Sequence, residues 1–88
     1  MTETKVWTVE IDITETPEET RAKATLHMGD ADCAAFGRAR RDPHDSNVPR
    51  IGEELATARA LSELSHKLLD ESARLIEEHV GHRVRLDH

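Results

Sequence analysis

PRIGEELATARALSELSHKLLDESARLIEEHV, residues 49–80, is the stretch that decides the fold. Pro49 suits the first position of a helix, where its missing N–H is not needed. The stretch holds no further proline, and its one glycine, Gly52, falls in the first turn. Gly81 follows directly and suits the position that ends a helix. Glu63 and Lys67 lie one helical turn apart and can form an ion pair. The stretch therefore predicts one continuous helix.

The apolar residues of this helix fall into two stripes when they are placed at 100° per residue. The first stripe contains Ile51, Leu55, Ala58, Leu69, Ala73, Ile76 and Val80. The second stripe lies roughly 90–100° further round the axis and contains Leu61, Leu64, Leu68 and Leu75. Together the two stripes cover nearly half of the circumference, so the helix has more apolar surface than one neighbour needs.

Three alternating segments precede the helix and predict strands. In residues 6–14, one face carries Trp7, Val9, Ile11 and Ile13. In residues 21–28, one face carries Ala22, Ala24, Leu26 and Met28. In residues 33–40, the small residues Cys33, Ala35, Gly37 and Ala39 share one face, and Ala34, Phe36, Arg38 and Arg40 share the other. Turn residues separate the segments, notably Pro17 and Gly29.

These elements predict one α+β domain over residues 1–88, in which a three-stranded antiparallel meander packs against one long C-terminal helix. Val84 and Leu86 could add a short C-terminal strand. If the small face of the third segment points inward, the helix can approach the sheet closely.

A size mismatch between helix and sheet predicts self-association. A helix over residues 49–80 is about 48 Å long, whereas strands of eight or nine residues span about 26–30 Å. We expect the first stripe to cover the sheet and the second stripe, from Leu61 to Leu75, to pack against its counterpart in a homodimer. The alternative is that a single wide stripe reaches further into one core.

Composition limits the function classes. The 88 residues carry a formal net charge of −6, so we expect no nucleic-acid partner and no membrane partner. The one cysteine, Cys33, cannot form an intramolecular disulfide and has no cationic neighbour in sequence, so we expect an unreactive thiol. No apolar run approaches the length of a membrane span or a signal peptide. These features predict a cytoplasmic protein.

Catalytic and cofactor motifs are absent from the sequence. It has no phosphate-binding glycine loop, no nucleophile elbow and no paired-cysteine zinc signature. We therefore expect neither an enzyme nor a bound cofactor or metal. A small-molecule or metal-binding role for His79 and His82 stays an alternative, although a solvated helix end explains them better.

One basic cluster gives a second alternative. Arg38, Arg40 and Arg41, with Arg50 nearby in sequence, could bind an anion or a nucleic acid. Charged residues of this kind also protect a strand edge from unwanted pairing, which is the interpretation we favour.

The sequence resembles small actinobacterial proteins, from mycobacteria and streptomycetes, of a domain-of-unknown-function family. The segments that carry the resemblance are Trp7-x-Val-x-Ile11, Arg21-Ala-x-Ala24, Asp42-Pro43, Val48-Pro-x-Ile-Gly-x-Glu-Leu55 and Ala58-Arg-Ala-Leu-Ser-x-Leu64. The resemblance implies a fold like that of the double-stranded-RNA-binding domain (dsRBD) and brings no catalytic residues.

Duplex RNA needs a basic surface, whereas the helix begins with acids at positions 53 and 54. We therefore expect a non-enzymatic interaction or structural module that self-associates.

Overall fold

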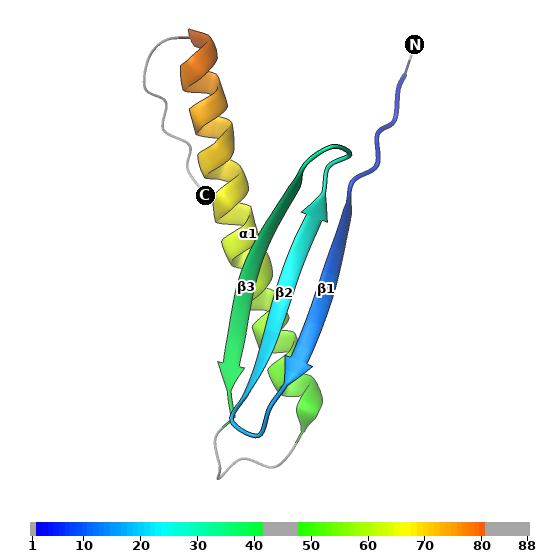
Figure 1. The fold of residues 1–88 in the computed structure, drawn as a ribbon, viewed down its shortest axis with the longest axis vertical. Helices are drawn as coiled ribbons and strands as arrows, with labels where there is room; N and C mark the ends of the chain where they lie inside the picture. Colours follow the sequence, from blue (N-terminus) through cyan, green and yellow to red (C-terminus); the bar gives the residue numbers. More distant parts are fainter. Residues whose placement is uncertain (1, 42–47, 81–88) are drawn as a thin grey trace.

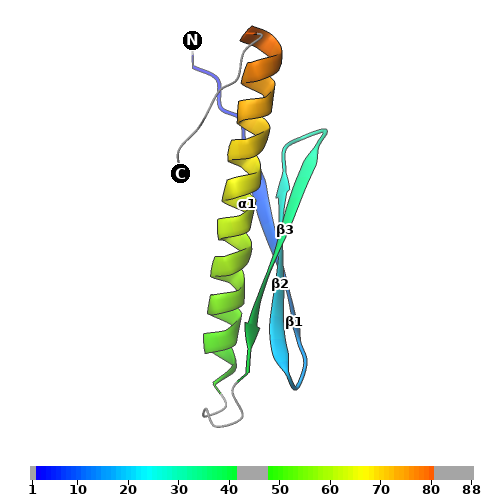
Figure 2. The ribbon, with the colours of Figure 1, turned by 90° about the vertical axis from the view of Figure 1, so that its left-hand side faces the viewer.

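The chain forms two layers, a three-stranded antiparallel sheet and one long helix, in a computed structural model that describes residues 2–41 and 48–80 (Figures 1 and 2). The strands are β1 (Thr8–Glu15), β2 (Glu19–His27) and β3 (Asp32–Arg40), and the sheet order is β1-β2-β3. The helix α1 spans Pro49–Val80. The predicted architecture and helix are confirmed. The expected C-terminal strand and the helix cap at Gly81 lie outside the described residues.

Short local contacts set the two hairpin turns. The N–H of Thr16 donates to the carbonyl oxygen of Glu19 at 2.9 Å, and the Thr16 hydroxyl accepts from the Glu19 N–H at 3.1 Å. In the second turn Gly29 has a φ of 82°, which a residue with a side chain rarely adopts. These turns set a register in which Asp12 lies opposite Lys23, and Arg21 lies opposite Arg38.

The core is built from small residues. Its buried apolar members are Ala22, Ala24, Leu26, Ala35, Ala39, Ala56, Ala60 and Leu64. Close approach of α1 to β3 explains this choice. A Cβ atom added at Gly37 would lie 2.3 Å from both the Ala56 carbonyl oxygen and the Ala60 nitrogen. The backbone of the helix therefore rests on β3, and the predicted packing role of the small face is confirmed.

The assignment of the two helix stripes was wrong. The helix faces the sheet through Ala56, Ala60 and Leu64, with Leu68 partly buried beside them. Ile51, Leu55, Ile76 and Val80, all from the first stripe, are instead exposed. The physical reason is the short distance at Gly37, since only a face of small residues can approach a strand so closely.

Long side chains of α1 also reach the edge of the sheet at β3. Arg59 Nη1 donates to the carbonyl oxygen of Arg38 at 2.8 Å, and Lys67 Nζ donates to the carbonyl oxygen of Ala34 at 2.8 Å. These contacts attach the helix to β3 over two successive turns.

The helix extends past the sheet and leaves β1 poorly covered. It packs mainly on β3 and β2 and touches β1 little. The last buried residue of α1 is Leu64, and the last turns of the helix project beyond the sheet (Figure 1). On the other side, Val9 and Ile13 of β1 face the helix layer yet stay about half exposed. The mismatch expected from the lengths of the elements is therefore present.

Candidate functional site

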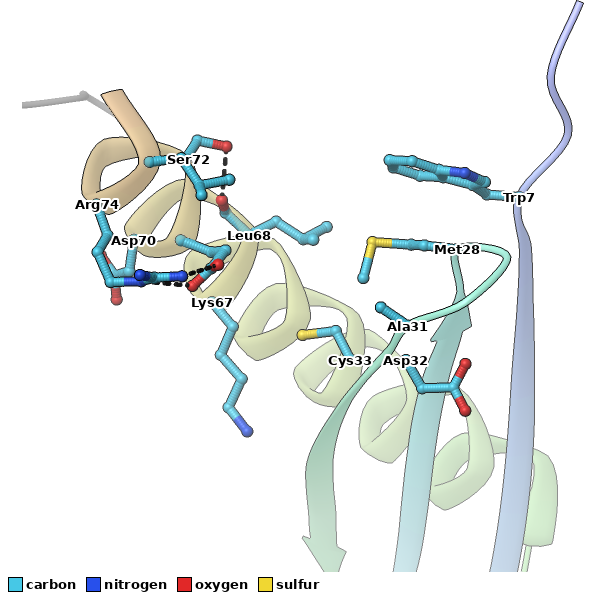
Figure 3. A pocket seen from close by; sticks show the side chains of 12 residues that line it. Trp7, Met28, Ala31, Asp32, Cys33, Lys67, Leu68, Asp70, Ser72 and Arg74 are labelled. Carbon is cyan, nitrogen blue, oxygen red and sulfur yellow. Dashed lines mark hydrogen bonds and ion pairs between the residues drawn. The ribbon is translucent and has the colours of Figure 1, made fainter. Parts of the chain in front are cut away.

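An open cleft separates residues 67–75 of α1 from the adjoining end of the sheet. Its volume is about 810 Å³. Trp7 and Met28 line it from the sheet side, and Leu68 lines it from the helix (Figure 3). Leu75, one to two turns further along the helix, also lines it. Cys33, which is partly buried, lies between them at the start of β3. We call this space the apolar cleft, because hydrophobic side chains contribute most of its surface.

Most of the charged groups around the apolar cleft are engaged in local contacts. Asp32 pairs with the His27 ring at 3.0 Å. Arg74 pairs with Glu71 and with Glu78 on the solvent side of the helix. The hydrogen bond from Arg74 lowers the pKa of the Glu71 carboxyl below its usual value. The Asp32–His27 contact joins β2 to β3, and the contacts of Arg74 lie within α1.

A second hollow continues the apolar cleft along the helix. It has a volume of about 390 Å³ and is lined by Leu61, Leu64, Ser65, Leu68, Leu69 and Ser72. Leu68 and Ser72 line both spaces. The two hollows therefore adjoin along one largely apolar surface of α1.

The structure divides the four leucines that we expected at a dimer interface. Leu64 is 4% exposed and belongs to the core of its own chain, and Leu68 packs against that core. Leu61 and Leu75 are 42% and 43% exposed. The expected interface is therefore wrong for Leu64, because this side chain covers β2 and β3 at the close helix–sheet contact. Sequence analysis did not assign Trp7 to a site, because alternation only placed it on one face of the first strand; the residue precedes β1 and is 51% exposed at the cleft.

The basic cluster forms on the opposite side of the sheet. Arg38, Arg40 and Arg41 line a hollow of about 560 Å³ with residues 17–19. Arg50 lies apart from them on α1, where its Nε is 2.8 Å from Glu54. The register adds Arg21 and Lys23 to this face. The alternation of residues 21–28 already indicates an outward direction for both, but the basic cluster expected from the sequence did not include them.

The remaining candidate site, a metal or small-molecule site at His79 and His82, is not assembled by the described residues. The His79 ring lies 2.8 Å from the carbonyl oxygen of Leu75 in its own helix, and His82 is outside the described residues. No group of three potential metal ligands occurs in residues 2–41 and 48–80. Within the same residues, no helix combines the length and the apolar character required to cross a membrane.

Comparisons with known proteins agree on a family and a fold. The sequence model of the Rv2632c-like family matches residues 5–85. The uncharacterized protein Mb1767 of Mycobacterium bovis is 48% identical over 71 residues, which cover 81% of this chain and 76% of that protein. The uncharacterized protein Rv2632c of Mycobacterium tuberculosis is 45% identical over 64 residues, which cover 73% and 69%. The crystal structure of Rv2632c superposes with a TM-score of 0.84 at 38% identity and covers 92% of this chain and 96% of that one.

Proposed function

Because this chain belongs to the Rv2632c-like family, whose matched relatives are described as uncharacterized, we propose a function from its own surface. The protein is a non-enzymatic module that self-associates, and a second copy fills the apolar cleft. The resemblance to a dsRBD does not enter this proposal.

The main support is the distribution of apolar residues, which is the reverse of that in a self-sufficient monomer. Six of the eight buried apolar residues are alanines, whereas twelve larger apolar side chains are well exposed among the described residues. Monomers rarely expose continuous apolar patches above a few hundred Å². A standard interface covers about 800 Å² per partner, roughly a ninth of the 7142 Å² surface of this chain.

The occupant of the apolar cleft follows from the shape of the chain. The last turns of α1, with Leu75 and Ile76, extend past the sheet in the described part of the chain and stay exposed. The helix-facing side of β1, with Val9 and Ile13, has little helix over it. Two copies related by a two-fold axis could exchange these surfaces, so that each helix end lies on the other copy's β1. In such a dimer, both exposed helix ends and both exposed β1 faces would be covered.

Edge-to-edge pairing through β1 is a poorer route to a dimer. Glu10 and Asp12 lie on one face of β1, and antiparallel pairing of two β1 strands would bring the acids of both copies close together. Like charges that face each other across strands are destabilising. The cleft involves no such conflict, since its exposed centre is apolar.

Sedimentation equilibrium tests this proposal. At concentrations on the order of 10⁻⁵ M, where dimers with micromolar Kd are populated, we expect a mass near twice the 9.9 kDa of the chain. Leu75→Glu and Trp7→Ala should each shift the mass toward the monomer, because they place a charge in the cleft or remove its largest side chain.

The matched control is Phe36→Ser, which removes an exposed apolar side chain from the opposite face of the sheet. It should leave the dimer intact, and circular dichroism should report unchanged helix content in all three variants. A wild-type protein that stays monomeric at this concentration would refute the proposal. So would a Phe36→Ser variant that dissociates as readily as Leu75→Glu.

A further inference from the structure

The outer face of the sheet, which points away from α1, carries an exposed aromatic ring. Phe36 lies in the middle of β3 and is 66% exposed, the second-highest value among the large apolar residues described. Its neighbour across the strand pair is Lys23, whose Nζ lies 5.8 Å from the centre of the ring. A phenyl ring at this place contributes nothing to the core, since alanines and leucines on the other face form it.

Two guanidinium groups lie beside this ring. Arg21 and Arg38 are direct cross-strand partners, and like charges in such a pair destabilise a sheet. Arg21 is held by Glu19, whose Oε1 lies 2.8 Å from its Nε, whereas the Arg38 side chain has no ion pair within the described residues. Arg21, Phe36, Gly37 and Arg38 together line a hollow of about 350 Å³. An anionic ligand in this hollow would relieve the repulsion between the two cations.

The cations continue along β3 in one direction. Arg40 shares the outer face with Arg38, and Arg41 follows at the end of the strand. From Phe36 to Arg41 the chain extends about 17 Å at 3.3 Å per residue. At the opposite edge of the same face, Glu10 and Asp12 make the surface of β1 acidic. Glu18 and Glu19 also line the hollow at Arg38, Arg40 and Arg41, but Glu19 is paired with Arg21. A negatively charged chain is therefore favoured along the cations of β3 and disfavoured along β1.

We propose that the outer face of β2 and β3 binds single-stranded nucleic acid, with a base stacked on Phe36 and the adjoining phosphates on Arg38, Arg40 and Arg41. Stacking of bases on aromatic side chains of an open sheet, next to cations that follow the backbone, is a general mode of single-strand recognition. Lys23 moves its amine from the ring to a phosphate when the base stacks. The net charge of −6 opposes binding at a distance, so we expect modest affinity that depends on these few contacts.

Fluorescence anisotropy with labelled oligo(U) and oligo(dT) tests the proposal. A length of roughly 12 nucleotides lies within the range of single-strand sites. Phe36→Ala should weaken binding about 5- to 150-fold, which corresponds to the loss of one stacked base, and Phe36→Trp should restore it. Arg38→Gln should weaken binding, whereas Arg50→Gln, with the same loss of charge on α1, should not. Phe36 and Leu75 lie on opposite layers, so failure here leaves the dimer proposal standing.

The salt dependence of the affinity and competition by other ligands test the proposed contacts further. With three or four phosphate contacts, a fourfold rise in monovalent salt should lower the affinity roughly 20- to 50-fold. Duplex of the same sequence and a nucleoside monophosphate should compete poorly. No binding at protein concentrations on the order of 10⁻⁴ M, the weak limit of non-specific binding, would overturn the proposal. So would stronger, Phe36-dependent binding of a phosphorylated acidic peptide, which would assign the face to a protein partner.

Discussion

The two halves of α1 have similar composition and opposite surroundings. In the N-terminal half, Ala56 and Ala60 lie against β3, and Leu64 completes the core. In the C-terminal half, Leu75, Ile76 and Val80 are exposed beyond the end of the sheet. The helix therefore places its smallest residues where contact with β3 is closest, and larger ones toward its end, where the described part of the chain covers them little. The apolar residues of one helix therefore build the core in one half and lie exposed in the other, where we propose that a second copy covers them.

The largest expected effect comes from the closest contact in the packed half. Gly37→Ala would place a methyl group 2.3 Å from backbone atoms of Ala56 and Ala60, which cannot rotate away. We expect a loss of about 3 kcal/mol or more in the free energy of unfolding, measured by urea denaturation. The control is Gly52→Ala, whose new Cβ would meet only the Thr20 side chain, at 2.8 Å from its Oγ1. That variant should change stability by less than about 1 kcal/mol, because better helix propensity offsets the crowding. Equal losses in the two variants would contradict the close helix–β3 contact.

An effect of intermediate size on the free energy of unfolding should distinguish the two halves of α1, when a leucine in each half is replaced by alanine. Leu64→Ala should lower the free energy of unfolding by about 2–5 kcal/mol, because it opens a cavity in the core. Leu75→Ala should lower it by no more than about 0.5 kcal/mol in dilute protein, where its surroundings are solvent. Urea denaturation over a range of protein concentrations checks both, and only the Leu75 variant should lose concentration dependence of stability. A large loss for Leu75→Ala in dilute protein would place it in a core within its own chain.

The smallest effect concerns the ion pairs on the exposed half. The pKa of Glu71 is lowered chiefly by its hydrogen bond with Arg74. A lowered folded pKa means that this contact stabilises the helix fully above the ordinary value of 4.5 and is lost as the pH falls through the lowered value. Arg74→Gln should therefore raise the Glu71 pKa toward its ordinary value, which an NMR titration of the carboxyl carbon would measure. An unchanged pKa would show that the two side chains do not pair in solution.

Sequence patterns predicted the elements well and the faces of the helix poorly. Alternation in β2 and β3 and the long proline-free stretch after Pro49 gave the sheet and helix, because both patterns reflect local geometry. The 100° spacing gave two stripes on α1, but it could not say which one meets the sheet. That choice depends on Gly37, whose missing side chain lets alanines, rather than the bulkier Ile51 and Leu55, make the contact.

The candidate sites were predictable only where a single strand carries them. Arg38, Arg40 and Phe36 share a face through alternation alone, so a sequence pattern contains that information. The pairing of Arg21 with Arg38 depends on register, which the turn at Gly29 sets. The apolar cleft joins Trp7 to Leu75 across most of the chain, and no local pattern indicates such a contact.

The hydrogen bonds from Arg59 and Lys67 to β3 limit how this protein can aggregate. An uncovered edge strand is a template on which further chains can add without end, and a filament needs two such templates per molecule. Here side chains of the helix occupy two carbonyl acceptors at the β3 edge, and the acids of β1 disfavour pairing with a second β1 strand at the other edge. Both features would favour the closed pair that we propose over an open polymer.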